Sequence, residues 1–100
     1  MVEPALRRGT TLMEQESYRV YLDRTSMLLA PGQADRLTAM VYPVNNMMEQ
    51  LISWSSSEPR TAVVDQNGVV TAIQPGTALI IASTPSGTMA TCAVRVVAWY

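Results

Sequence analysis

The chain of 100 residues contains no histidine, no lysine and no phenylalanine, and its only cysteine is Cys92. Without histidine, the sequence cannot supply a Ser-His-Asp or Cys-His nucleophile, or a histidine ligand for a metal. A single cysteine cannot form an internal disulfide. Ala90 and Val94 share the strand parity of Cys92, which predicts that this residue is a small buried side chain rather than a reactive thiol.

Charge and hydropathy narrow the classes of partner. The net charge is −1 and all seven cations are scattered arginines, so we expect no nucleic-acid binding. No apolar run reaches the length of about 18 residues that a membrane helix needs, so no membrane insertion is expected. Residues 1–9 lack the apolar segment of a signal peptide. An exported form of this domain is therefore expected to belong to a longer chain.

Three short apolar runs between Ile52 and Ile81 are the strongest structural signal. Within them small or polar residues alternate with large apolar ones, which is typical of half-buried strands. Ser-Glu-Pro, Asn-Gly and Pro-Gly separate the runs, and these residues favour turns. The same pattern begins near Tyr18 and continues to the end of the chain. It predicts an all-β fold, an immunoglobulin-like two-sheet sandwich of seven to eight short strands.

The strand pattern also divides the chain. We interpret residues 18–98 as one domain, which at this size can bury a core without a metal or a disulfide. Residues 1–17 show no period, and we interpret them as a tail that is a linker, the end of a preceding domain or sequence introduced by cloning. Residues 99–100 form the C-terminal end.

An ordered set of motifs gives the chain a family resemblance. The motifs are Leu29 to Gly32, Leu37 to Pro43, Trp54-Ser55-Ser56, Ala62-Val63-Val64-Asp65, Gly68-Val69-Val70-Thr71-Ala72, Gly76-Thr77-Ala78-Leu79-Ile80 and Val94-Arg95-Val96. In this order and spacing the sequence resembles the bacterial immunoglobulin-like domain, group 2, over roughly residues 18–97. The resemblance implies a module that is commonly strung in series on surface proteins.

Strand parity predicts which side chains fill the space between the two sheets. Trp54 is expected to be the central aromatic side chain of the core. The residues expected to pack around it alternate inward along their strands: Leu37, Val41, Val64, Ile80 and Val94.

The carboxylates do not suggest catalysis. A glycosidase needs two facing carboxylates in a cleft, and a small sandwich filled with side chains offers none. We therefore predict that the chain is not an enzyme and has no cofactor. The run from Asp65 to Gly68 superficially resembles a calcium loop but lacks its further acidic ligands. It predicts instead a hairpin turn in which Asp65 or Asn67 bonds the local backbone, while calcium shared with a neighbouring domain stays open.

Two pairs of residues are candidates for ligand contact. Met47 and Met48 lie in the longest connection, where exposed methionines suit adaptable contacts. The alternative is that one of them plugs the end of the sandwich. Trp99 and Tyr100 follow the last predicted strand and could stack on sugar rings. The alternative is that they pack on the next domain or on the N-terminal tail.

Tyrosines and arginines on the outer faces complete the candidate surface. Tyr18, Tyr21 and Tyr42 alternate with core residues and form an aromatic patch if their strands are neighbours. Unpaired sheet edges can recruit a further strand. We expect arginine side chains to blunt those edges and keep the isolated domain monomeric, namely Arg19, Arg24 and Arg95.

Three functions fit these observations. The first is a non-catalytic structural and adhesion module of a larger bacterial cell-surface or secreted protein. Its partners would be neighbouring domains of the same polypeptide, or host or bacterial surface glycans or proteins. The second is a decoration of a phage tail or capsid that aids attachment to cells. The third is an accessory domain that contacts carbohydrate for an extracellular polysaccharide enzyme. The ordering rests on family analogy, because fold constrains function only loosely.

Overall fold

The computed structural model describes residues 18–43, 49 and 51–98, and these residues form an all-β fold. Nine strands follow one another along the described chain. They are β1 (Arg19–Leu22), β2 (Ser26–Leu29), β3 (Ala34–Arg36), β4 (Ala39–Tyr42), β5 (Ser53–Ser56), β6 (Ala62–Val64), β7 (Val69–Ala72), β8 (Gly76–Ser83) and β9 (Met89–Val96).

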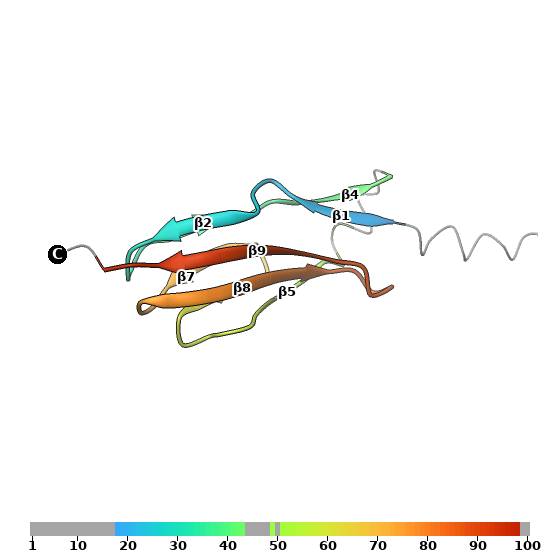
Figure 1. Ribbon diagram of the computed structural model, residues 1–100. Coiled ribbons are helices and arrows are strands. Elements are labelled where there is room, and N and C mark those ends of the chain that lie inside the picture. The colour runs from blue at the N-terminus through green and yellow to red at the C-terminus, as the bar shows by residue number, and fades with distance from the viewer. Residues whose placement is uncertain (1–17, 44–48, 50, 99–100) are drawn as a thin grey trace, which may run out of the picture.

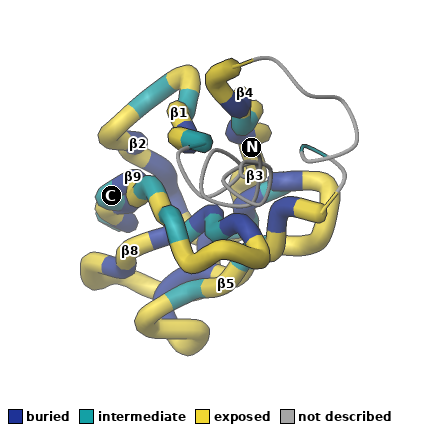
Figure 2. The backbone as a smooth tube through the Cα atoms, turned by 90° about the vertical axis from the view of Figure 1, so that its right-hand side faces the viewer, coloured by how far each residue is buried: buried dark blue, intermediate teal, exposed yellow. Residues whose placement is uncertain are grey.

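The strands make two layers that face each other across the core. One layer is a four-stranded sheet in the order β2-β9-β8-β5. The other layer contains the pair β1-β4 and the three-stranded sheet β3-β7-β6. Figure 1 shows the strands running along the length of the molecule, and Figure 2 shows the layers from one end. This arrangement confirms the predicted immunoglobulin-like sandwich.

The strand count exceeds the predicted seven to eight because one long strand changes partner midway. The backbone N–H of Leu37 donates to the carbonyl of Gly68 at 2.9 Å, which continues the pairing of β3 with β7. At the next residue, Thr38, the pairing passes to the other side. Asp23 N–H donates to the Thr38 carbonyl at 3.1 Å, which continues the pairing of β4 with β1. β3 and β4 are therefore two halves of one extended segment.

Buried apolar side chains from both layers fill the space between them. The larger cluster joins β2, β8 and β9 of one layer to β6 and β7 of the other. A smaller cluster lies at the β1–β4 end and contains Val20, Val41, Ile52 and Ala82. Along the strands, buried and exposed positions alternate (Figure 2). Of the residues expected in the core, four are buried: Leu37, Val41, Ile80 and Val94.

Trp54 takes a different position from the expected one. It is half-buried, and it packs against both clusters rather than lying at the centre of one. Val64 is also half-buried and packs against the larger cluster. The fully buried positions include small side chains such as Ala62 and Ala82, whereas the bulky indole remains partly exposed beside the two clusters.

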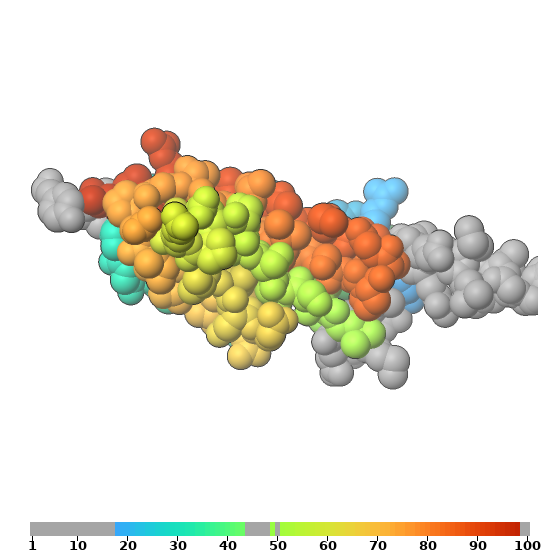
Figure 3. Space-filling view, turned by 90° about the horizontal axis from the view of Figure 1, so that it is seen from below, coloured from blue at the N-terminus to red at the C-terminus, as the bar shows by residue number. Residues whose placement is uncertain are grey.

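The second and last strands of the domain run in the same direction. β2 pairs with β9 in parallel, with Met27 beside Val94 and Leu29 beside Val96. Because the chain runs along both strands the same way, β1 begins at one end of the molecule and β9 finishes at the other. Figures 1 and 3 show this separation, with β1 in blue and the end of β9 in red at opposite ends.

The turn between β6 and β7 is held by one carboxylate. The Asp65 Oδ1 atom accepts hydrogen bonds from the N–H of Asn67 at 2.8 Å and of Val69 at 3.0 Å. Gly68 then adopts a φ of 83°. A side chain at this position would collide with the Leu37 carbonyl oxygen and lie 3.1 Å from the Trp54 ring. The Asp-Gln-Asn-Gly run is therefore a packed hairpin turn beneath the indole.

We predict that Gly68→Ala destabilises the domain more than Gly32→Ala. Gly32 has a similar φ of 89° but nothing within 4 Å of an added Cβ, so it isolates the backbone cost. Gly32→Ala should lower the free energy of unfolding by about 1–2 kcal/mol. Gly68→Ala adds an overpacking cost, for a total loss of roughly 2–5 kcal/mol. Urea unfolding of both variants measures the difference, and equal losses would contradict the close packing at Gly68.

Candidate binding face on the first strand pair

The outward-facing side chains of β1 and β4 form an apolar exposed surface beside a hollow. Along β1, Val20 is buried and its neighbours Arg19 and Tyr21 are exposed, as the two-residue period of a strand requires. Along β4, Val41 is buried and Met40 and Tyr42 are exposed. Each strand therefore contributes one face to the smaller cluster and the other to the surface.

The register of the pair brings four of these side chains together. Tyr21 lies opposite Met40, and Arg19 lies opposite Tyr42. Residues directly opposite on one face have Cβ atoms about 5 Å apart, and diagonal neighbours such as Tyr21 and Tyr42 are within reach of long side chains. Tyr21, Met40 and Tyr42 are 47%, 49% and 63% exposed. We call Arg19, Tyr21, Met40 and Tyr42 the tyrosine face.

Two shallow hollows meet on the tyrosine face. One, of about 370 Å³, is lined by Tyr21, Met40, Val41 and Tyr42. The other, of about 320 Å³, is lined by Arg19, Tyr21, Tyr42 and Pro43. The two tyrosines therefore stand between an apolar hollow beside Met40 and a hollow beside the Arg19 guanidinium. A ligand that spans both would meet aromatic rings in its middle and different chemistry at each end.

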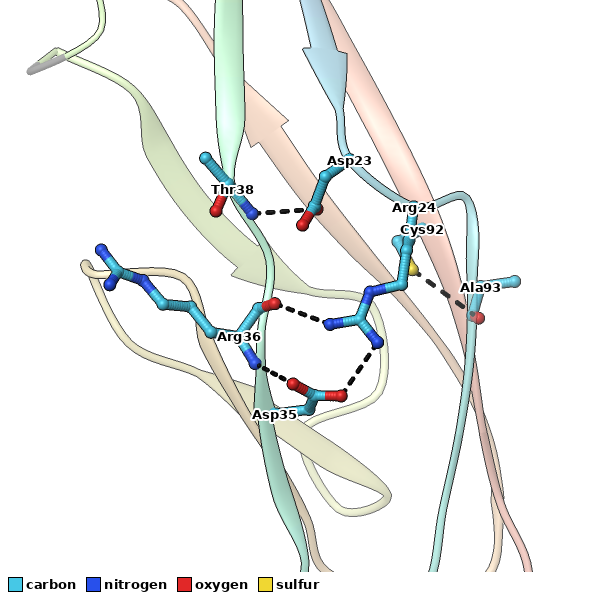
Figure 4. A network of polar contacts seen from close by, with 7 residues as sticks. All are labelled: Asp23, Arg24, Asp35, Arg36, Thr38, Cys92 and Ala93. Carbon is cyan, nitrogen blue, oxygen red and sulfur yellow. Dashed lines mark hydrogen bonds and ion pairs between the residues drawn. The ribbon is translucent and has the colours of Figure 1, made fainter.

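A polar network holds the bend that follows β1 and thereby positions the face (Figure 4). Thr38 N–H donates to Asp23 Oδ1 at 3.0 Å, so the side chain of Asp23 joins its backbone in extending the β1–β4 pairing. Arg24 Nη1 donates to Asp35 Oδ2 at 2.9 Å, and Arg24 Nη2 donates to the Arg36 carbonyl at 2.8 Å. Arg24 therefore ties the bend to β3.

The network also shifts the protonation of its members. The hydrogen bond from Arg24 holds the pKa of Asp35 below its usual range, and a hydrogen bond from the Arg36 N–H adds to the effect. In return, the hydrogen bond to Asp35 raises the pKa of Arg24. Both side chains are exposed, so water and salt screen the pair and its main effect is geometric.

The far edge of β4 is covered by a carboxylate. Glu49 Oε2 accepts a hydrogen bond from the N–H of Val41 at 3.3 Å. This carboxylate satisfies a backbone donor that the pairing with β1 leaves unused, because each strand edge presents its N–H groups in alternation. β4 is thus held on one side by β1 and on the other by Glu49.

Cys92 lies beneath the same bend. Its side chain is buried in β9, and its thiol is not paired with another cysteine. Burial raises the pKa of the Cys92 thiol. Low accessibility and a disfavoured thiolate are both typical of an inert structural cysteine.

The sequence predicted an outer patch of three tyrosines, and the structure places only two of them there. Tyr21 and Tyr42 do lie on neighbouring strands, but Tyr18 is half-buried and packs against the smaller cluster. Tyr18 shares the parity of Val20, which explains its inward position. Arg24 does reach a sheet edge, because its guanidinium binds Asp35 and the Arg36 carbonyl on the edge strand β3. Met47, Met48, Trp99 and Tyr100 lie outside the described residues.

In the described part of the chain, neither a metal-binding cluster nor a membrane-spanning helix is found. No group of three or more histidine, cysteine, aspartate or glutamate side chains could hold a metal ion there. Among the described residues, no helix is long and apolar enough to cross a membrane.

Residues 18–94 match the family of the bacterial Ig-like domain (group 2). The chain belongs to this family. The match covers the whole sandwich up to the middle of β9, in agreement with the resemblance of the motifs between Leu29 and Val96. The family is a non-catalytic one. In this bacterial Ig-like domain, the sandwich carries the tyrosine face on β1 and β4.

The bacterial Ig-like domain is similar to short segments of much longer proteins. An uncharacterized protein of Clostridium acetobutylicum is 43% identical over 68 residues, which are 68% of this chain and 7% of that protein. A lacto-N-biosidase of Bifidobacterium bifidum is 35% identical over 71% of this chain and 6% of its own length. An A type blood N-acetyl-α-D-galactosamine deacetylase of Flavonifractor plautii is 32% identical over 84% of this chain and 10% of its own.

Solved structures of surface layer protein SbsC share the fold of the bacterial Ig-like domain. Domains 1–6 of that protein superpose with a TM-score of 0.65 and 20% identity, over 81% of this chain and 13% of SbsC domains 1–6. A second structure, of its domains 4–9, gives a TM-score of 0.64 over 81% of this chain and 14% of the other. At this identity the likeness concerns the fold.

We predict that Asp35 makes the stability of the domain depend on pH in the acid range. Its pKa is lowered in the folded state, so its contribution is present above the ordinary carboxyl pKa of 3.8 and is lost as the pH falls through the lowered value. Between about pH 5 and about pH 2, the free energy of unfolding of Asp35→Asn should therefore fall less than that of the wild type. Thermal melts followed by circular dichroism measure this.

Two further variants sharpen the test of the Asp35 prediction. Arg24→Gln removes the first cause of the shift and should flatten the acid dependence in the same way. Glu58→Gln is the control, because Glu58 is exposed and forms no ion pair with a described residue. An acid profile of Asp35→Asn that matches the wild type would show that the pair does not couple to folding.

We predict that the Cys92 thiol of the native domain does not react with a thiol reagent such as dithiobis-nitrobenzoate. Burial blocks access and raises the thiol pKa, so the thiolate needed for reaction is scarce. In denaturant, one thiol per chain should react at once. Rapid reaction of the native domain would contradict the burial of Cys92.

Proposed function

We propose that the domain is a non-catalytic structural module of a larger bacterial cell-surface or secreted protein. In this function it separates its neighbours along the polypeptide and leaves its outer faces free for adhesive contact. The proposal rests on one observation: the chain enters and leaves the sandwich at opposite ends (Figure 1).

The spacing follows from the parallel pairing of β2 with β9. A domain whose terminal strands were antiparallel neighbours would bring its two ends together and fold the polypeptide back. Here the strands run the same way, so a domain before β1 and another after β9 lie far apart. At about 3.3 Å per residue, the stretch from Arg19 to Leu29 spans up to roughly 35 Å.

The packing of the sandwich supports a stiff spacer. Buried side chains join both layers throughout, and the eight-residue strands β8 and β9 run side by side from Gly76–Val96 to Ser83–Met89. A fully paired hairpin at the centre of a sheet resists bending, because any bend would break ladder hydrogen bonds and expose packed side chains.

The relatives support an extracellular setting. Two of them are named for glycan substrates: the lacto-N-biosidase and the A type blood N-acetyl-α-D-galactosamine deacetylase. Complex glycans of this kind lie outside bacterial cells, so a domain shared by such enzymes fits a surface or secreted protein. In each relative the matching segment is a small part of a long chain, which fits a module that separates other domains.

The spacer function predicts the geometry of a fusion protein. When the full chain is inserted between two fluorescent proteins, single-molecule energy transfer should show one narrow population of low efficiency. Denaturant should convert it to a broad distribution, because the unfolded segment becomes a flexible coil. A high-efficiency population in the native state would mean that the ends lie together, and a broad native distribution would mean that the module is not stiff. Either outcome would overturn the proposal.

A further inference from the structure

We propose that the tyrosine face binds a terminal acidic sugar that carries an N-acyl group, which is a sialic-acid-type residue at the end of a glycan. This inference goes beyond the spacer function and does not depend on it, because a module that binds nothing can still separate domains.

The aromatic rings supply the first part of the recognition. Tyr21 and Tyr42 come from neighbouring strands and are 47% and 63% exposed. Rings of this kind present an apolar surface for the C–H groups of a sugar and a hydroxyl that can donate or accept a hydrogen bond. Exposed apolar side chains that gather on one surface often mark a binding site. The ring of the ligand would therefore lie over these two tyrosines.

Charge supplies the second part. Arg19 lies opposite Tyr42 and lines the hollow that the two tyrosines share with Pro43. Among the described residues, Arg24 is paired with Asp35, whereas Arg19 forms no ion pair. Asp23 follows β1, and its carboxylate accepts a hydrogen bond from the Thr38 N–H, so it lies at the other end of the strand from Arg19. An exposed guanidinium in these surroundings favours a carboxylate, which it can bind through two parallel hydrogen bonds.

The different chemistry of the two hollows favours one kind of acidic sugar over another. The hollow on the other side of the tyrosines is lined by Met40 and Val41 and has almost no polar surface. It suits the methyl of an N-acyl group, which a uronic acid lacks. The two cross-strand rows, Arg19–Tyr42 and Tyr21–Met40, lie about 7 Å apart, because alternate residues of a strand are separated by that distance. A single sugar with a carboxylate at one edge and an N-acyl group at the other spans this distance.

The size of the face favours a small ligand over a protein. A stable protein interface engages about 20–30 residues and about 800 Å² on each side. The tyrosine face consists of four side chains around two hollows of about 370 and 320 Å³. Such volumes lie at the lower end of those of small-molecule sites. The openness of the hollows predicts weak binding, with a Kd on the order of 1 mM, so several copies would be needed for firm attachment.

The experiment titrates the ¹⁵N-labelled full chain with 3′-sialyllactose and follows amide chemical shifts. We expect saturable shifts at β1 and β4, and none with lactose, which has the same core without the acidic sugar. Arg19→Gln and Tyr42→Ala should each weaken binding by about tenfold or more, because a charge-assisted contact or a stacking surface is lost. Tyr42→Phe keeps the ring and should bind within a few-fold of the wild type.

Matched controls separate a specific site from general stickiness. Arg95→Gln and Leu28→Ala change an exposed arginine and its exposed apolar cross-strand neighbour on the other layer, and should leave binding unchanged. Thermal melts of all variants check that each one folds, which the exposure of the substituted residues favours.

The titrations have outcomes that would overturn the proposal. No shift at 10 mM sialyllactose, a value about tenfold above the expected Kd, would exclude a useful site. If lactose bound as tightly as 3′-sialyllactose, Arg19 would not recognise a carboxylate. If a galacturonic acid oligosaccharide bound as tightly, the apolar hollow would not recognise an N-acyl group. Shifts confined to the outer face of β8 and β9 would place the site elsewhere. None of these results bears on the distance between the ends of the domain.

Discussion

The crossing of the first strand from one layer to the other is the constraint on which the rest of this structure depends. β1 pairs with β4 in one layer, and three residues later β2 pairs with β9 in the other. The bend is held by Asp23, whose carboxylate meets Thr38, and by Arg24, which reaches Asp35 and the Arg36 carbonyl (Figure 4). These contacts bring the two sheets together at one edge and close the sandwich there.

Two consequences of the crossing define what the domain can do. The first is direction, since β2 can lie parallel to β9 only after the chain has changed layers, and this pairing sends the two ends of the domain apart. The second is exposure. Because β1 remains on the opposite layer beside β4, the outward side chains of that pair stay at the surface, where Tyr21 and Tyr42 meet. The spacer function and the candidate binding face thus share one structural cause.

Small and large side chains are distributed unequally between the core and the outer face of β1 and β4. The small side chains of Ala62, Ala82 and Cys92 are fully buried, whereas the large Trp54 ring is only half-buried and lies against Gly68. Larger apolar side chains, including Tyr21, Met40 and Tyr42, are on the outside of the first strand pair. A core built this way needs no large aromatic residue at its centre, and the aromatic side chains remain available for contacts at the surface.

Elements that depend on neighbouring residues could be predicted from local patterns. Alternation predicted the all-β sandwich, Asp65 and Gly68 predicted the hairpin turn, and the ordered motifs predicted the family. The pairing of distant strands is known from the fold alone. It shows that β2 pairs with β9, that the segment from Ala34 to Tyr42 changes partner after Leu37, and that Tyr21 lies beside Tyr42 while Tyr18 turns inward. Periodicity and turn chemistry act over a few residues, whereas strand pairing is selected by the packing of whole layers, which no local pattern records.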